Sequence, residues 1–190
     1  VSGSATGGLA YNPAMRQFTW SGEIGPGTLG YVAEEVSAPT YINLGDLPVN
    51  PPASLCDHAG LQGNCDDGAV VFDLTLNNAS YTFYDESLTQ LVAFTNGLLF
   101  GPEGQTGLAC TACPQRFPEE TELNQVLAGL WRDIDMSGDV GEWYAAVITG
   151  LLSEPTDKVF YVNWHDAGQF GAPLTTSRNA IAIVLDGQSE

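Results

Sequence analysis

The residues best suited to chemistry lie in the stretch WRDIDMSGDVGEWY at 131–144. Side-chain oxygens alternate along it, and the candidate metal ligands are Asp133, Asp135, Ser137, Asp139 and Glu142. Calcium prefers such oxygen ligands, and the EF-hand loop uses the same alternation. The EF-hand motif is incomplete, because Tyr144 occupies the position of its final bidentate glutamate. The stretch predicts either a calcium site or a solvated acidic turn between two strands. We expect that the protein requires no cofactor, with calcium as the one candidate.

The two histidines each have an aspartate as a neighbour in the sequence. His58 follows Asp57, and His165 precedes Asp166 at the end of an expected strand. A catalytic triad needs a nucleophile, a base and an orienting acid in a defined arrangement. The sequence contains no GxSxG, HExxH or P-loop motif that would supply one. We therefore expect surface or structural histidines and predict no catalytic residue.

The four tryptophans suggest a carbohydrate-directed alternative. Trp20, Trp131, Trp143 and Trp164 could form a platform for a sugar, and nearby carboxylates could act as acid and base. However, β-sandwiches commonly bury tryptophan, and a chain this acidic has carboxylates in most turns. Carbohydrate binding or cleavage is therefore the alternative rather than the main hypothesis.

The four cysteines form two pairs that are close in sequence. Cys56 and Cys65 flank one short loop, and Cys110 and Cys113 flank another. In an exported protein such pairs are usually disulfides. A four-thiolate zinc site is disfavoured because the eight-residue spacing of the first pair is unlike a zinc knuckle. Free thiols or other pairings are the remaining alternatives, and we expect two disulfides in a secreted, extracellular protein.

The charge balance excludes several classes of partner. The chain has 23 acidic residues against 5 lysines and arginines, which gives a formal net charge of −18 at pH 7. Nucleic-acid binding needs clustered basic residues, so it is excluded, and an anionic membrane surface would repel the chain. No run of 18 apolar residues is present, so we expect no membrane insertion.

Short strand-forming runs are separated by 22 glycines and 11 prolines. The runs are rich in Val, Ile, Tyr, Phe and Thr, which predicts an all-β protein, mainly an antiparallel, jelly-roll-like β-sandwich. The expected strands are 16–20, 28–36, 69–76, 81–85, 91–95, 98–101, 144–152, 158–166 and 179–187. At most one short helix is expected, at 120–129, although an extended conformation also suits that segment.

Local patterns add a hairpin, a core face and a division of the chain to this prediction. Asn96-Gly97 lies between two apolar runs and predicts a hairpin, because both residues tolerate positive φ. In the run 158–166, Phe160, Val162 and Trp164 share the cleaner core-facing side. We divide the chain into an N-terminal β segment at 1–36, a long disulfide-bearing connection at 37–68 and a main β-sandwich at 69–190. A single domain over 1–190 is the alternative.

Several motifs, taken in order, are similar to a known family. They are FTWSGEIGPG at 18–27, CDDGAVVFDL at 65–74, YTFYDESLTQLVAFTNGLLFG at 81–101, LNQVLAGLWRDIDMSGDVGEWYAAVI at 123–148 and KVFYVNWHDAGQFG at 158–171. Together they resemble the β-rich accessory region C-terminal to the catalytic domain in exported subtilisin-like (S8 family) serine peptidases of Gram-negative bacteria. Two positions depart from that pattern: Gly129 replaces a proline, and Asn163 replaces a glutamate.

The resemblance implies a function for a parent protein rather than for this chain alone. The catalytic Asp, His and Ser blocks of the subtilisin fold are missing from the sequence, so proteolysis cannot be assigned to its residues. The resemblance implies a non-catalytic accessory domain that binds protein substrate, the parent's own catalytic domain or a surface. A carbohydrate-binding or adhesion module of an extracellular protein is the alternative, and the sequence leaves the oligomeric state open.

Overall fold

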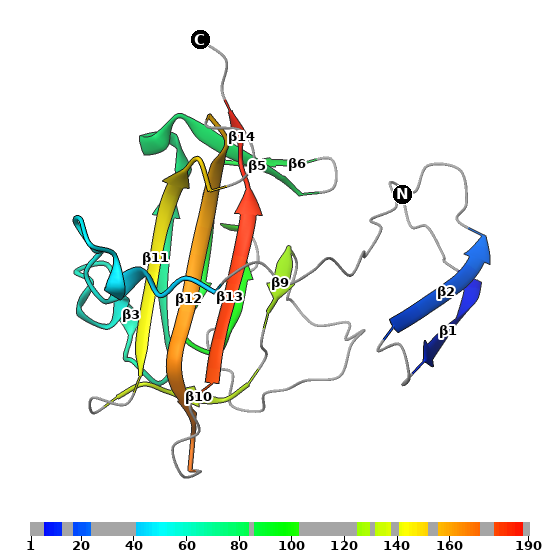
Figure 1. The fold of residues 1–190 in the computed structure, drawn as a ribbon, viewed down its shortest axis with the longest axis horizontal. Helices are drawn as coiled ribbons and strands as arrows, with labels where there is room; N and C mark the ends of the chain where they lie inside the picture. The colour runs from blue at the N-terminus through cyan, green and yellow to red at the C-terminus, as the bar shows by residue number, and fades with distance from the viewer. Residues whose placement is uncertain are drawn as a thin grey trace. The chain divides into compact units, whose positions relative to one another are not determined.

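The computed structural model describes residues 6–12, 17–23, 41–83, 86–102, 125–129, 132–137, 141–151, 156–171 and 177–187. The chain divides into two compact units, Val1–Thr40 and Tyr41–Glu190. The described residues form antiparallel strands and three short 3-10 helices, so the predicted all-β, sandwich-like class is confirmed (Figure 1). No helix in these ranges is long and apolar enough to cross a membrane.

The first unit contains one β-hairpin. Strand β1 (Thr6–Asn12) pairs with β2 (Gln17–Glu23), and Leu9 lies opposite Trp20 in this register. The strand that the sequence predicts at 28–36 lies outside the described residues.

In the second unit, the described residues form three sheets. The largest has the order β3 (Gln62–Gly63), β4 (Gly68–Asp73), β7 (Gln90–Phe94), β8 (Leu98–Phe100) and β9 (Val126–Ala128). In the second, β12 (Lys158–Gln169) pairs with β10 (Ile134–Asp135), β11 (Glu142–Thr149) and β13 (Ser177–Val184). The third joins β14 (Asp186–Gly187), β5 (Ala79–Phe83) and β6 (Glu86–Leu88).

The segment considered for a helix contains a strand instead. Residues 126–128 form β9, which pairs with β8 and places Leu127 opposite Leu99. The helical spacing of the leucines there is therefore misleading, because pairing with β8 determines the conformation. Residues 120–124 lie outside the described part of the chain.

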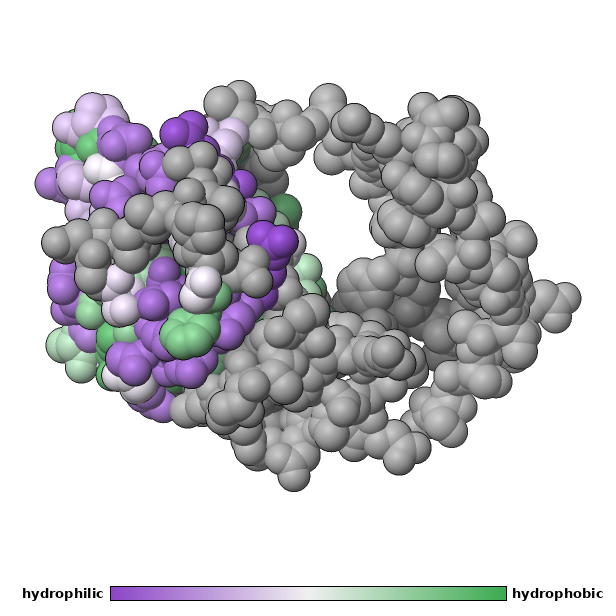
Figure 2. Space-filling view, turned by 90° about the horizontal axis from the view of Figure 1, so that it is seen from below, coloured by the Kyte–Doolittle hydropathy of each residue, from purple (hydrophilic) through white to green (hydrophobic). Residues whose placement is uncertain are grey.

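The main core contains residues of both larger sheets. Val70 and Leu91 belong to the same buried cluster as Trp143, Phe160 and Trp164. The predicted core face of β12 is confirmed, because Phe160, Val162 and Trp164 are at most 1% exposed. By the usual area scale, each such side chain stabilises the fold by roughly 2 kcal/mol. Hydrophilic residues cover much of the described surface on the face that Figure 2 shows.

The opposite face of β12 is also covered. We call residues 41–47 the strap; it contains the 3-10 helix η1 (Leu44–Asp46) and runs across β11 and β12 in Figure 1. Leu44 lies in a second buried cluster with Tyr144, Val159 and Tyr161. Residues 41–68 thus belong to the second unit, whereas the sequence assigned them to a connection. Leu44 and Leu55 of this segment are buried against the sheets, whereas Val49 is 73% exposed.

A buried turn joins three distant parts of the second unit. Asn96 is fully buried between β7 and β8, in the turn that the sequence predicts, and Gly97 has a φ of 80°. The Asn96 amide nitrogen donates to the Asp67 carboxylate at 3.1 Å. Its amide oxygen accepts from the Ile134 N–H at 2.7 Å, and its backbone oxygen accepts from the Arg132 N–H at 3.3 Å.

Thr95, the residue before Asn96, also binds the segment that leads into β4. Its hydroxyl donates to the Asp66 carbonyl at 2.6 Å and accepts from the Gly68 N–H at 3.0 Å. The side chains of Thr95 and Asn96 thereby hold the start of β4 and the start of β10 against the turn. Backbone pairing joins β7 to β8.

We expect Asn96→Ala to lower the free energy of unfolding by about 2–3 kcal/mol, because it leaves a buried N–H unsatisfied and removes two hydrogen bonds. Urea unfolding followed by circular dichroism measures the change. The control is Asn77→Ala, since the Asn77 side chain is exposed and its loss should be nearly neutral. Equal stability of the two variants would contradict the structural role of Asn96.

Candidate functional site

The predicted calcium ligands do not converge among the residues described. Asp135 accepts from the Ser137 N–H at 2.8 Å and from its hydroxyl at 2.5 Å, so these two side chains bind each other. Glu142 lies on β11 and accepts from the Asn43 amide at 3.2 Å. Asp139 lies outside the described residues. Within the described ranges, no group of three or more His, Cys, Asp or Glu could hold a metal ion, and calcium stays a prediction.

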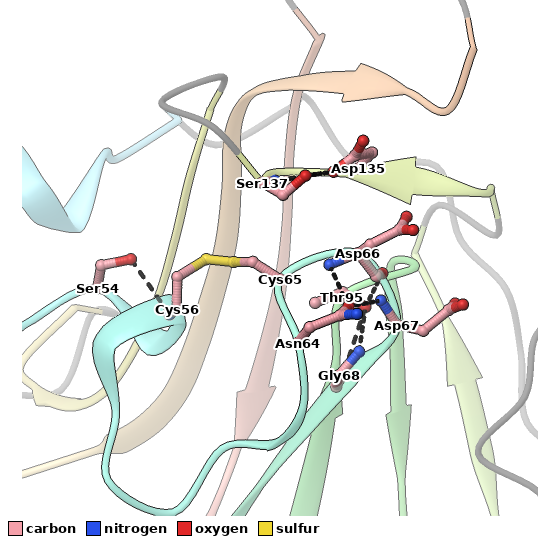
Figure 3. The surroundings of a disulfide bond; sticks show 10 residues. All are labelled: Ser54, Cys56, Asn64, Cys65, Asp66, Asp67, Gly68, Thr95, Asp135 and Ser137. Carbon is pink, nitrogen blue, oxygen red and sulfur yellow. Dashed lines mark hydrogen bonds between the residues drawn. A yellow bond between two sulfur atoms is a disulfide. The ribbon is translucent and has the colours of Figure 1, made fainter.

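The acidic turn instead faces a second acidic segment. Figure 3 shows Asp135 beside the loop that carries Asp66 and Asp67. The Met136 N–H donates to the Cys65 carbonyl at 3.0 Å and holds the two segments together. We call Asp66, Asp67, Asp133 and Asp135 the carboxylate cluster.

The carboxylate cluster is electrostatically strained. Burial raises the pKa of Asp66, and the neighbouring carboxylates of Asp135, Asp67 and Asp133 raise it further. Burial also raises the pKa of Asp133, followed by the charges of Asp67 and Asp135. A raised carboxyl pKa means that folding disfavours the charged form. The penalty is present at neutral pH and disappears as the pH falls below the unfolded pKa near 3.8.

We expect Asp133→Asn to raise the melting temperature at neutral pH by about 1–3 °C, because partly exposed charges contribute about 0.2–1 kcal/mol. The difference from the wild type should vanish below pH 3.8, where both proteins are neutral at this position. Differential scanning calorimetry across this pH range measures it. The matched control is Asp157→Asn, a loop carboxylate outside the cluster. A lower melting temperature for Asp133→Asn at neutral pH would show that the charge stabilises the fold.

The disulfide loop is next to this cluster. Cys56 and Cys65 are joined by a disulfide, the pairing that the sequence predicts, and Cys110 and Cys113 lie outside the described residues. The 3-10 helix η2 (Leu55–Asp57) begins the loop and buries Leu55 in the main core.

His58 lies within the disulfide loop. Its Nδ1 accepts from the Gly60 N–H at 3.0 Å, and its ring packs against Phe72 with centroids 6.4 Å apart. These contacts correspond to a structural role for His58.

The second histidine belongs to a polar network on the outer face of the sheet. The Tyr41 hydroxyl lies 3.1 Å from His165 Nδ1, and the two rings stack with centroids 5.8 Å apart. His165 Nε2 lies 3.5 Å from the Asp166 carboxylate, which is 3.4 Å from Arg178 Nε. Neighbouring strand residues normally face opposite sides. Here the irregular register between His165 and Ala167, with Asp166 at a φ of 49°, places its carboxylate beside its neighbour's ring.

This network can orient groups and form hydrogen bonds. Both ring nitrogens of His165 have protein partners, so the imidazole is held in one orientation. Burial raises the pKa of Tyr41 to about 12, which is only partly offset by the hydrogen bond from Asn163. The phenol is therefore protonated at neutral pH and is a weak nucleophile. The arrangement is chemically suited to recognition of polar groups.

Two of the four tryptophans cannot form a sugar platform. Trp143 and Trp164 lie opposite each other on β11 and β12, and both are fully buried. Trp131 lies outside the described residues, as does the side chain of Trp20. The described part of the chain therefore contains no exposed tryptophan face.

Sequence reasoning missed the residues that connect the network to the strap. Alternation along 158–166 predicts that Val159, Tyr161, Asn163 and His165 share one face, but no pattern in the sequence indicates what covers that face. Asn163 is fully buried, and its amide nitrogen donates to the Tyr41 hydroxyl and to the Asn43 side chain, both at 3.1 Å. An asparagine between apolar neighbours in a strand was the available signal.

Comparison with family models, with curated proteins and with solved structures finds no match to this chain. The assignment of function therefore depends on the motifs of the sequence and on the geometry described above.

We expect Tyr41→Phe to lower the free energy of unfolding by about 1–2 kcal/mol at neutral pH, because Asn163 loses a buried acceptor. The Tyr41 pKa is raised from 10.0 to about 12 in the folded protein, so the wild type loses stability as the pH rises between these values. The gap between the two proteins should narrow over that range. Urea unfolding at neutral and alkaline pH measures it, and a gap that does not change with pH would contradict the prediction.

Proposed function

We propose that this chain is a non-catalytic binding domain of a secreted subtilisin-like serine peptidase. The observation that carries the proposal is the order of the motifs that resemble the accessory region of such enzymes. The motif at 65–74 covers β4, that at 81–101 extends from β5 to β8, and that at 158–171 covers all of β12. The resemblance therefore involves residues that build the framework, as expected for relatives that share a domain.

The outer face of the second sheet supports a binding role. It combines a positioned histidine with charged groups, namely His165, Asp166 and Arg178, and an aromatic ring of the strap, Tyr41, stacks on this histidine. Aromatic residues and arginine are enriched where proteins recognise other proteins. Of the partners expected from the sequence, extended protein substrate fits this polar and aromatic surface best. The parent's own catalytic domain is the second candidate.

The proposal is tested with the purified 190-residue chain. Reduced and carboxymethylated casein serves as an unfolded protein ligand, and binding is measured by biolayer interferometry. We expect reversible casein binding that weakens roughly tenfold in Arg178→Ala, since one interfacial hot spot contributes about 1.4 kcal/mol or more. The control is Arg132→Ala, because Arg132 lies outside this network.

Three outcomes would overturn the proposal. The first is hydrolysis of casein by the chain alone, together with loss of hydrolysis in His165→Ala. The second is binding to a polysaccharide panel without binding to casein, which would favour the carbohydrate-binding alternative. The third is binding to neither ligand nor to a subtilisin-type catalytic domain encoded in the same reading frame.

A further inference from the structure

The strap is hydrogen-bonded to the sheet through side chains of the sheet rather than through a backbone ladder. Strand neighbours normally exchange backbone hydrogen bonds, but the described backbone-to-backbone bonds include none between the strap and β11 or β12. Side chains of β12 bind the strap backbone instead. The Ile42 N–H donates to the Tyr161 hydroxyl at 3.1 Å, and the Leu44 N–H donates to the Asn163 amide oxygen at 3.4 Å. The sheet thus binds the N–H groups on either side of Asn43, the residue that caps the 3-10 helix η1.

One strap side chain acts as an anchor. Leu44 is fully buried, and its cluster includes Tyr144, Val159 and Tyr161. Burying a leucine in such surroundings contributes roughly 2 kcal/mol. In peptide recognition, hydrogen bonds to the peptide backbone give affinity and side-chain pockets give specificity, and the strap has a counterpart of each.

The sheet also restricts which residues can stand on either side of Leu44. The Asn43 side chain lies between two polar groups of the sheet: it accepts from the Asn163 amide at 3.1 Å and donates to Glu142 at 3.2 Å. Gly45 lies against Tyr144, where an added Cβ would be only 2.8 Å from two ring carbons and from the hydroxyl oxygen. The outer face therefore selects the sequence Asn-Leu-Gly.

We propose that the outer face of β11 and β12 is a binding site for a peptide that forms an asparagine-capped turn with an Asn-Leu-Gly core, and that the strap occupies this site in cis. The strap is then an intramolecular competitor, and a protein ligand must displace it. This inference rests on the proposed function, which it deepens by naming the site and the ligand class. Side chains hold the strap without a backbone ladder, so it can leave while the sheet remains paired.

The test uses the full chain with Leu44→Asp, which empties the anchor pocket because a buried carboxylate has no partner there. A fluorescent peptide of residues 40–48, TYINLGDLP, is titrated and followed by anisotropy. We expect it to bind the variant roughly tenfold or more tightly than the wild type, where the strap competes. Leu76→Asp is the matched control, since Leu76 is 82% exposed, and it should behave like the wild type.

Two further controls identify the site. A peptide with Asp in place of Leu44 should bind none of the proteins. Adding Asn163→Ala to the Leu44→Asp variant should weaken peptide binding again, because the acceptor of the anchor's N–H is lost. In the wild type, the Ile42 and Leu44 amides should exchange hydrogen faster than the Val162 amide, as local opening of the strap requires.

The proposal is overturned if folded Leu44→Asp does not bind the peptide at about 1 mM, a concentration that corresponds to only about 4 kcal/mol of binding. Global unfolding of this variant also overturns it, as does exchange of the strap and β12 amides at one common rate. Peptide binding without binding to casein or to the subtilisin-type catalytic domain would retain this site and reject the proposed function. Casein binding without peptide binding would do the reverse.

Discussion

The hydrogen bonds of the buried Asn96 amide are the constraint on which the second unit depends. A primary amide has two donors and two acceptor lone pairs, and in the interior each unpaired group costs about 1–3 kcal/mol. Asn96 meets this requirement only when Asp67 and Ile134 are both in place. The turn between β7 and β8 therefore fixes the end of the disulfide loop and the approach to β10 at the same time.

This junction has an electrostatic cost. Asp67 accepts from Asn96 and belongs to the carboxylate cluster, where Asp66 and Asp133 have raised pKa values. The bonds of the turn hold like charges close together in a chain that already carries a net charge of −18. The geometry of the hydrogen bonds prevails because an unpaired buried amide costs more than repulsion between partly solvated carboxylates.

The two faces of β12 have different roles. Phe160, Val162 and Trp164 fill the core, whereas Tyr161 and Asn163 point to the outer face and bind the strap. The core face is covered by the other large sheet, whereas the outer face is covered by the strap, which side-chain hydrogen bonds and the buried Leu44 hold in place. The second interface is the one that we propose a ligand can take over.

The sequence alone determined the class of fold, the Asn96-Gly97 turn, the core face of β12 and the pairing of Cys56 with Cys65. Each depends on contacts between near neighbours or on a simple period along the chain, so local patterns are sufficient. Only the tertiary structure placed the strap on the sheet and brought the two acidic segments together. Tyr41 and His165 are 124 positions apart, and no local pattern records which distant side chain will satisfy a buried asparagine. That choice is made by packing, because buried polar groups must find partners wherever the folded chain supplies them.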